Sequence, residues 1–539
     1  MEKNITWWKK VLVYQIYPLS FKDNNGDGIG DIQGIISKLD YLKNYGVDVI
    51  WLSPVYASPM DDNGYDISNY QEVNPIFGTN KDLDELIEHI HERGMKIIMD
   101  LVVNHTSDMH HWFLDAKSSK DAKYRDYYIW QDEPKPEIHS IFSGPAWTYD
   151  EKTDQYYFHL FSKRQPDLNW QNPKLRQDIY QMMNYWLDKG IDGFRMDVIE
   201  LIGKDVSKGL LGDGPYLETY LEEMYETCFK GRDIMNVGEM GGISVSRAQA
   251  LTSNPKLGLH MTFQFSHLGI DEVPRKGKWA LKDYEPLKLK EILIKNNEIF
   301  KESGWQALFL SNHDQPRQVS RFGSEKHRIA SAQMLFTMLY LQRGTPYVYM
   351  GEEIGMTGIR FDDIKKYKDI ETINYYNDAL SQGLDEKQVM QSIYKKSRDN
   401  SRTPFQWSNK PYAGFSVKTP WLSVNPNYKE VNLENDLSNP NGVYHYTKNL
   451  FEVRKKYDAF HEGSFKPIDP KDPNTFIYLR ENEKHSILVI TNLTAHEVTT
   501  NLEEFKDYEL LLENNPTLLD KGTVLKPYHA AVYIKEFRR

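Results

Sequence analysis

Eight short apolar runs recur along the 539 residues of the chain, and stretches with the pattern of amphipathic helices separate them. The runs span residues 11–17, 47–52, 96–103, 192–198, 234–238, 262–265, 306–310 and 346–350. Strands that alternate with helices are typical of parallel βαβ units, and eight such units can close into a (β/α)₈ barrel. The sequence therefore predicts an α/β protein built on a TIM barrel.

Two segments interrupt this alternation. Residues 104–170 follow the third predicted strand and are rich in Tyr, Trp, Asp and Pro, which indicates an inserted subdomain. Residues 463–539 contain short strand-like runs with turn signals at regular spacing, which favours a small all-β sandwich domain. We therefore expect the catalytic barrel to comprise residues 1–103 and 171–462, with a loop-rich, polar region from about residue 360 to 430.

The bulk properties exclude several kinds of protein. Cys228 is the only cysteine, so no internal disulfide can form and a zinc cluster is not expected. A net charge of −11 argues against a nucleic-acid-binding surface. The chain has no run of about 18 apolar residues that could span a membrane, and its first residues lack the pattern of a signal peptide. We expect a cytoplasmic monomer that acts on a small molecule and binds neither nucleic acid nor membrane.

Polar side chains gather where the predicted strands end, which is where TIM barrels carry their functional residues. Asp62 and Tyr65 follow the second strand. The third, fourth, fifth and seventh strands supply Asp100, Asn104, His105, Arg195, Asp197, Glu239, His313 and Asp314. A single Asp after a strand is usually a cap or turn residue, and a single His is usually structural. The convergence of several carboxylates and histidines at one end of a barrel favours an active site instead.

Arg195 and Asp197 lie two positions apart in the apolar stretch GFRMDVIE, so a strand would turn both side chains to one face. Burying these charges is costly unless they are paired or used. Cleavage of a glycosidic bond needs one carboxylate as nucleophile and one protonated carboxyl as acid. Arg195 should lower the pKa of Asp197, which suits a nucleophile, while Glu239 has no cation beside it and suits the acid. The alternative is an ion pair that only braces the barrel.

The stretches DLVVNHTS, GFRMDVIE, VGEM and SNHDQPR resemble, in order and spacing, the four signature regions of the α-amylase superfamily, glycoside hydrolase family 13. The resemblance covers essentially the whole chain. It implies a barrel with an inserted domain B and a C-terminal domain C. It also implies that Asp197 is the nucleophile, Glu239 the acid/base and Asp314 the stabiliser of the transition state. Retention of configuration follows, with the two reacting carboxyl groups about 5–5.5 Å apart.

The same resemblance assigns residues that bind the sugar. The implied set, beyond Arg195 and the three carboxylates, is Asp62, Tyr65, His105, Phe161, Gln165, Val198, His313 and Arg398. His105 and His313 would bind the reacting glucosyl unit, and Tyr65 would stack beneath it. Asp62 and Arg398 would fix its non-reducing end.

The stretch DNNGDGIGD could bind calcium, because its start matches the calcium-loop pattern D-x-N-x-D-G. An EF-hand would place Glu at the twelfth position, which is Gly34 here, so this is not an EF-hand. The loop resembles the single calcium site of oligosaccharide-cleaving family members, which implies a structural ion bound by Asp23, Asn25, Asp27, Asp31 and the Ile29 carbonyl. The alternative is a turn without metal. No catalytic cofactor is expected.

Within the superfamily the chain is most similar to exo-acting glucosidases that cut α-1,6 bonds, the oligo-1,6-glucosidases and dextran glucosidases. Trehalose-6-phosphate hydrolases come next. Val198 favours α-1,6 cleavage, because family members that cut α-1,4 bonds carry Ala or Thr after the nucleophile. A phosphate would need cations at the mouth of the site, and Arg275, Lys276 and Lys278 could supply them. A catalytically dead binding relative is disfavoured because all three carboxylates are present, and transfer to a sugar acceptor instead of water stays open.

Overall fold

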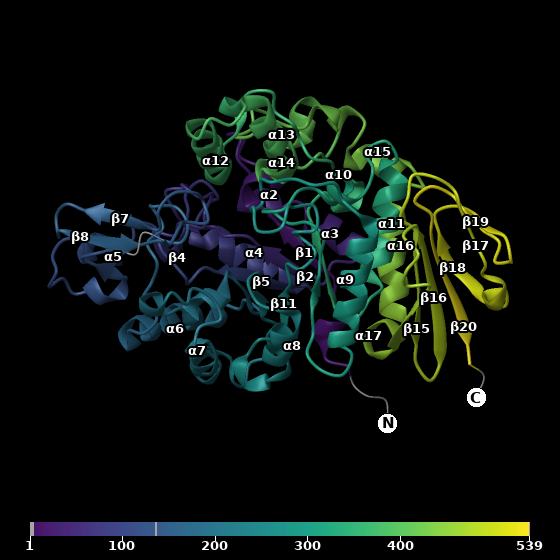
Figure 1. Cartoon of the computed structure of the whole chain (residues 1–539), viewed down its shortest axis with the longest axis horizontal. Coiled ribbons are helices and arrows are strands. Elements are labelled where there is room, and N and C mark those ends of the chain that lie inside the picture. The colour runs from purple at the N-terminus through teal and green to yellow at the C-terminus, as the bar shows by residue number, and fades with distance from the viewer. Residues whose placement is uncertain (1–4, 135–136, 538–539) are drawn as a thin grey trace.

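The computed structural model describes residues 5–134 and 137–537, and within them the predicted barrel is confirmed (Figure 1). Its parallel strands are β1 (Val13–Ile16), β2 (Val49–Leu52), β5 (Lys96–Leu101), β9 (Phe194–Met196), β10 (Val237–Glu239), β11 (Met261–Phe263), β12 (Ala307–Leu308) and β13 (Thr345–Tyr349). They lie in the order β11-β10-β9-β5-β2-β1-β13-β12. A parallel bridge between Thr262 and Gln306 joins the two ends of this order, so the sheet closes. Each strand overlaps one of the eight apolar runs.

Helices cover the outside of the strands. The larger ones are α3 (Leu39–Tyr45), α4 (Asn80–Glu92), α6 (Pro173–Asp188), α7 (Leu217–Met224), α8 (Val245–Ser253), α9 (Pro286–Ile299), α11 (Arg328–Tyr340) and α16 (Val443–Lys456). Their N-termini follow ordinary capping chemistry. Thr79, for example, forms a capping box with Asp82 at the start of α4. None of the helices in the described ranges is long and apolar enough to cross a membrane.

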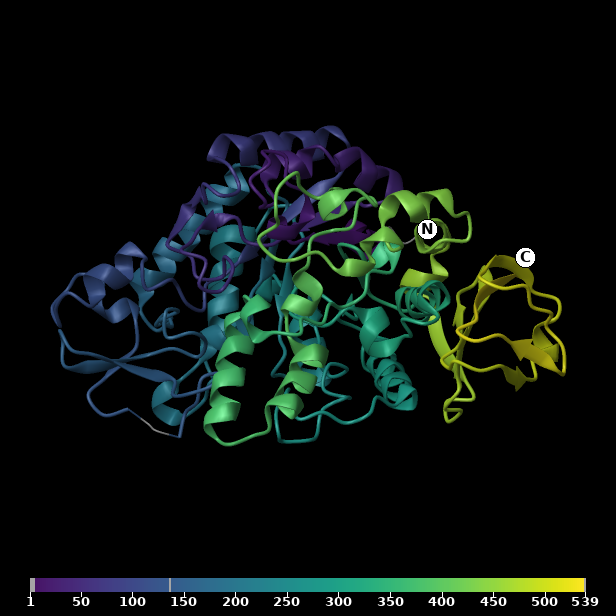
Figure 2. The ribbon, with the colours of Figure 1, turned by 90° about the horizontal axis from the view of Figure 1, so that it is seen from above.

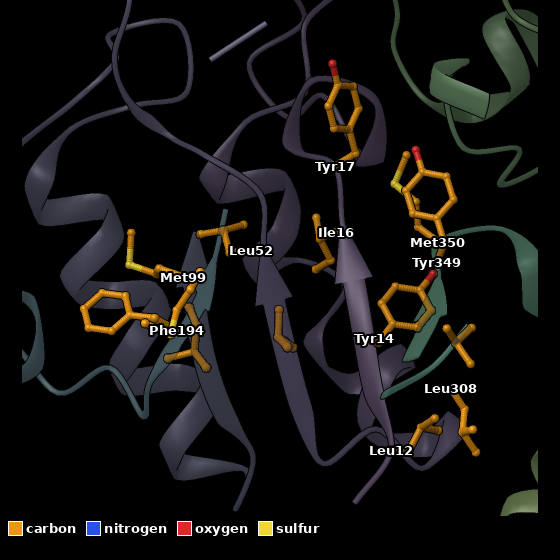
Figure 3. Packing of buried hydrophobic residues seen from close by; sticks show 14 of the residues in the cluster. Leu12, Tyr14, Ile16, Tyr17, Leu52, Met99, Phe194, Leu308, Tyr349 and Met350 are labelled. Atoms are coloured by element: carbon orange, nitrogen blue, oxygen red, sulfur yellow. The ribbon is translucent and has the colours of Figure 1, made fainter. Parts of the chain in front are cut away.

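Alternate strand residues build two apolar layers. Val13, Trp51, Phe263 and Tyr347 belong to a cluster contributed by strands from around the whole barrel, which therefore fills its interior. Their neighbours along the strands pack outward against the helices. Figure 3 shows part of this outer layer beside β1, with Tyr14, Tyr349 and Leu308 on one side and Leu52, Met99 and Phe194 on the other. Side chains in register with the inner layer point into the barrel, and this places the charged residues described below.

The segment between β5 and α6 forms a separate lobe, which lies at the opposite end of the molecule from the C-terminal strands (Figure 2). It contains α5 (His111–Ala116) and a small antiparallel sheet in the order β6 (Trp130–Gln131), β8 (Gln155–Phe158), β7 (Trp147–Asp150). This lobe carries Phe161 and Gln165 on the chain that returns to the barrel.

The C-terminal strands form an antiparallel sheet with a smaller pair beside it. The sheet order is β14 (Ser464–Ile468), β15 (Thr475–Glu481), β16 (His485–Asn492), β20 (Ala530–Glu536), β18 (Glu509–Glu513), and the pair is β17 (Val498–Thr500) with β19 (Thr523–Leu525). Leu488 and Ile490 pack toward Leu525 of the pair. Residues of the opposite face, such as Tyr478, join the main core, and the Tyr478 hydroxyl donates to the Met338 carbonyl of α11 at 3.2 Å. The layered all-β arrangement therefore docks on the barrel.

The region from about 360 to 430, expected to be loop-rich and polar, also contains two helices, α12 (Ile370–Ser381) and α13 (Glu386–Lys396). Asp369 and Asp385 cap these helices, and Val389 and Ile393 bury an apolar face between them and the rest of the chain. The two helices sit above the barrel in Figure 1, next to α14 (Asp399–Arg402).

Candidate active site

The charged pair of the fourth strand lies inside the barrel. Arg195 of β9 is in register with Asp100 of β5, and its side chain is 1% exposed. Its Nη1 lies 2.5 Å from Asp100 Oδ1 and 2.5 Å from Asp197 Oδ1. Its Nη2 lies 2.8 Å from Glu239 Oε2, at the end of β10. One guanidinium therefore contacts three carboxylates from three neighbouring strands, among them the predicted nucleophile and acid.

This sharing changes the expected protonation. Burial is the largest influence on Asp197 and raises its pKa well above the ordinary value. Arg195 lowers that pKa, but the carboxylates of Glu239 and Asp100 raise it again. The prediction that Arg195 keeps the pKa of Asp197 low is therefore wrong. Glu239 has no cation beside it in the sequence, but the fold brings it to the same guanidinium. A buried cluster with an excess of carboxylates favours retention of a proton, and a glycosidase needs one such proton for its acid step.

Val198 follows Asp197 in a strained turn. Its φ of 37° and ψ of 43° lie in the left-handed region, which β-branched residues rarely adopt. Such a conformation costs on the order of 1–3 kcal/mol and persists only where the surroundings impose it. Here the Val198 backbone N–H donates to Glu239 Oε2 at 3.1 Å. The turn therefore holds the Val198 backbone against Glu239, directly after Asp197, and its side chain is half-buried.

Asp314 lies on the loop after β12, surrounded by cations. Its Oδ1 accepts hydrogen bonds from Arg402 Nη2 at 2.6 Å and Arg398 Nη1 at 3.3 Å. Its Oδ2 lies 3.0 Å from His313 Nε2. Burial pushes the pKa of Asp314 upward, but these three neighbours outweigh it and hold the pKa well below its ordinary value. Asp314 is therefore ionised, unlike the cluster around Arg195, and suits stabilisation of positive charge.

Arg398 connects Asp314 to the residues predicted to bind the non-reducing end. Its Nη2 lies 2.8 Å from Asp62 Oδ1 and 2.6 Å from Asp369 Oδ1. The other oxygen of Asp62 accepts from Gln165 Nε2 at 3.1 Å. The same amide nitrogen lies 3.2 Å from His105 Nε2. A continuous polar network therefore joins the β2 loop, the inserted lobe and the segment after α13.

Aromatic rings line this network. Tyr65 stacks on His313 with ring centroids 5.2 Å apart and an interplanar angle of 8°, and the Arg195 guanidinium lies 5.8 Å from the Tyr65 ring. Phe161 packs on His105 at 5.1 Å. The structure thus brings all the predicted catalytic and sugar-binding residues into one connected site at the carboxyl ends of the strands.

Comparison with known proteins agrees with this geometry. Residues 15–463 match the model of the alpha amylase catalytic domain. The chain belongs to the α-amylase family. It is 50% identical to an oligo-1,6-glucosidase of Bacillus cereus, over 99% of this chain and 100% of that protein. A glucan 1,6-alpha-glucosidase of Streptococcus pneumoniae is 47% identical, over 97% of this chain and 98% of its own length. The crystal structure of Bacillus licheniformis trehalose-6-phosphate hydrolase superposes with a TM-score of 0.92 at 44% identity, covering 98% of this chain and 99% of that one.

Several residues of this α-amylase-family site were not predicted as part of it. Arg402 holds Asp314, and Asp369 holds Arg398. Asp100 was noticed only as a polar strand residue, yet it shares Arg195 and accepts from the Trp51 indole N–H at 2.7 Å. Arg402 stands one helical turn after Arg398, and that spacing was the available signal. No sequence signal pointed to Asp369, because it lies in the region that was expected to be loop-rich and polar.

One of the three cations that could bind a phosphate, Lys278, is already paired with a carboxylate. Lys278 Nζ lies 2.6 Å from Glu371 Oε2, and Glu371 also lies 3.4 Å from Arg398 Nε. Lys278 is therefore near the network of the site, but its charge is already paired. Arg275 and Lys276 are exposed on the same loop.

The predicted calcium loop is held by its own hydrogen bonds. Asp23 accepts from the backbone N–H groups of Gly26 at 2.6 Å and Gly28 at 2.9 Å. Asp31 accepts from Asn24 and Asn25 N–H groups at 2.9 and 3.0 Å, and caps α2 (Ile32–Ile36). No group of three acidic, His or Cys side chains placed to hold a metal occurs among the described residues. These bonds close the loop, but each carboxylate keeps lone pairs that could bind an ion, so the calcium site stays a prediction.

Proposed function

We propose that the chain is a retaining, exo-acting α-glucosidase that hydrolyses α-1,6 bonds at the non-reducing end of isomalto-oligosaccharides and releases glucose. The observation that carries the proposal is the set of three carboxylates around Arg195. The Tyr65 and His313 rings link this set to Asp314, and Arg398 links Asp314 to Asp62. A nucleophile, an acid and a grip on the terminal sugar thus lie in one network. The names of the Bacillus cereus and Streptococcus pneumoniae relatives support the bond type.

In the proposed reaction, Asp197 attacks the anomeric carbon of the terminal glucosyl unit. Glu239 gives its proton to the departing glycosidic oxygen, so a covalent glycosyl-enzyme forms and the aglycone leaves. Glu239 then takes a proton from a water molecule, which attacks the anomeric carbon and frees Asp197. Asp314, held ionised by its cationic neighbours, stabilises the positive charge that develops on the sugar in both steps.

Arg195 has two tasks in this scheme. Its bidentate contacts fix the Asp197 and Glu239 carboxyls relative to one another. Its single charge also limits how many of the surrounding carboxyls are ionised together, which favours one protonated group before the reaction starts.

Trehalose-6-phosphate is the second candidate substrate, supported by the Bacillus licheniformis neighbour. The Lys278–Glu371 ion pair argues against it, because a phosphate at that point would have to compete with Glu371 for the ammonium group. A neutral sugar meets no such competition. We therefore rank the α-1,6 oligosaccharide first.

The test is glucose release from isomaltose, panose, maltose, trehalose and trehalose-6-phosphate at matched concentrations. We expect isomaltose and panose to react fastest, with the α-anomer of glucose appearing first by ¹H NMR. Asp197→Asn should abolish turnover with an unchanged circular dichroism spectrum, while Asp188→Asn on the exposed end of α6 should leave the rate unaltered. Fastest cleavage of trehalose-6-phosphate would overturn the substrate assignment, and first appearance of the β-anomer would overturn the mechanism.

Two further proposals rest on the sequence. We propose a structural calcium ion at Asp23, Asn25, Asp27, Ile29 and Asp31, supported by the spacing of these oxygen ligands. We also propose that the chain acts as a cytoplasmic monomer, supported by its composition, and light scattering after size-exclusion chromatography tests the oligomeric part.

A further inference from the structure

A cavity of about 230 Å³ lies beside the active site but outside it. Its walls come from residues 281–284, from α10 (Gln318–Phe322) and the loop before it, and from the end of α13 with the following residues. None of the predicted catalytic, sugar-binding or calcium residues lines it. Its size is below that of a pocket for a drug-sized molecule and suits a single monosaccharide.

The charges around this cavity favour an anion. The lining cations are Lys282, Arg321, Arg360 and Lys395, and the lining carboxylates are Asp271 and Asp283. The Asp271 carboxylate is gripped by Arg321 at 2.7 and 3.0 Å and by Lys396 at 2.7 Å, so it is already neutralised. Within the described part of the chain, the ammonium groups of Lys282 and Lys395 form no ion pair or hydrogen bond. Arg321 and Arg360 are paired with Asp271 and Glu325, so the two unpaired lysines face one carboxylate, Asp283, that forms no ion pair among the described residues. The cavity therefore keeps a small excess of positive charge on a protein whose net charge is −11.

The polar groups in the walls favour hydroxyls as well. Tyr284 and Tyr394 are half-buried in the lining, and their hydroxyls have no hydrogen-bond partner among the described residues. Ser320 Oγ accepts from the Gly358 N–H and can still donate. Asn400 Oδ1 is buried at the wall without a partner. A ligand with several hydroxyls could form hydrogen bonds with these wall groups, which lack partners in the protein. Polar groups buried without a hydrogen-bond partner cost free energy.

We propose that this cavity is a non-catalytic binding site for a hexose monophosphate. The phosphate contacts the two free lysines, whose charge-assisted bonds suit phosphate oxygens. The hexose faces the tyrosines and the wall at Ser320. Pro316 and Asn400 line the cavity and stand two residues from Asp314 and Arg398 respectively. Occupancy therefore reaches the loops that carry two residues of the catalytic network, and the site is placed to modulate the enzyme.

Isothermal titration of glucose 6-phosphate tests this site, with the enzyme first saturated with 1-deoxynojirimycin so that the active site is filled. We expect glucose 6-phosphate still to bind at one site per protein molecule. The double variant Lys282→Ala/Lys395→Ala should weaken it at least tenfold, and Tyr394→Phe should weaken it by a smaller factor. The matched control Lys256→Ala/Lys301→Ala removes two exposed lysines that do not line the cavity and should bind like the unaltered protein.

Titrations of glucose and of inorganic phosphate separate the two parts of the ligand, and each should bind at least tenfold more weakly than glucose 6-phosphate. Equal binding of inorganic phosphate would show an adventitious ion only, and equal binding of glucose would remove the role of the lysines. If glucose 6-phosphate shows no binding once the active site is filled, the proposed site is overturned. Equal loss of that binding in the control variant Lys256→Ala/Lys301→Ala would overturn it as well. None of these outcomes depends on which glycosidic bond the enzyme cuts.

Discussion

Replacement of Glu200 by Gln should stabilise the protein at neutral pH. Glu200 lies three residues after Asp197 and is 5% exposed. Its Oε1 accepts from the Gly242 N–H at 2.8 Å, and its Oε2 is buried without a partner. Burial is the largest cause that raises the pKa of this carboxyl, from 4.5 to about 8. Gln keeps the acceptor for Gly242 and the shape of the side chain, but it cannot ionise in the unfolded chain.

The magnitude follows from the difference in proton binding. Between pH 4.5 and about 8 the folded state holds the Glu200 proton while the unfolded state releases it. Folding therefore takes up a proton in this range, and the free energy of unfolding falls as the pH rises. Each pH unit contributes about 1.4 kcal/mol, so the cost at pH 7 is about 3 kcal/mol and at pH 4.5 or below it vanishes. With an unfolding entropy of about 2.1 cal/mol/K per residue, Gln should raise Tm by about 3 °C at pH 7.

Differential scanning calorimetry of both proteins at pH 5 and pH 7.5 measures this effect. The Tm gain of Glu200→Gln should be large at pH 7.5 and small at pH 5. Glu222→Gln on the exposed face of α7 is the matched control, because that carboxyl stays in solvent in both states. An equal gain at the two pH values, or a loss at pH 7.5, would refute the argument that Glu200 is buried as a neutral acid.

Three other changes probe the site and the calcium loop. Glu239→Gln should lower kcat by ~10²–10⁴-fold on isomaltose, and a p-nitrophenyl glucoside, whose leaving group needs little protonation, should lose much less; equal losses would contradict an acid role. Val198→Ala shortens the side chain that directly follows Asp197 and should raise the maltose-to-isomaltose ratio of kcat/KM by about tenfold, whereas an unchanged ratio would remove Val198 from specificity. Chelation by EDTA should lower Tm and added calcium should restore it, with kcat unchanged at assay temperature; identical melting curves would favour the hydrogen-bonded turn without metal around Asp23.

The local sequence was enough to predict the barrel and to name most of the residues that the structure brings together. Apolar runs such as VDVIWL that alternate with amphipathic helical stretches are typical of buried parallel strands, so their number and order predict the topology. The positions of Asp197, Glu239 and Asp314 after three of those strands then follow, because parallel strands end on the same side of the barrel.

Contacts between segments that are distant in the sequence could not be predicted from local patterns. Asp369 and Arg402 come from a region whose helices bury Val389 and Ile393 in contacts with other parts of the chain. The cavity beside α10 likewise joins segments more than a hundred residues apart. No periodicity along the chain encodes such pairings.

The fold class, the strand ends and the chemical groups at those ends follow from the order of residues along the chain. The protonation of those groups does not, because it depends on contacts that form only in the folded protein. Arg195 looked in the sequence like the partner of Asp197 alone, but the closed barrel places Asp100 and Glu239 against the same guanidinium. A pKa depends on burial and on every charge within a few ångströms, and the chain order shows only the charges that are neighbours along it.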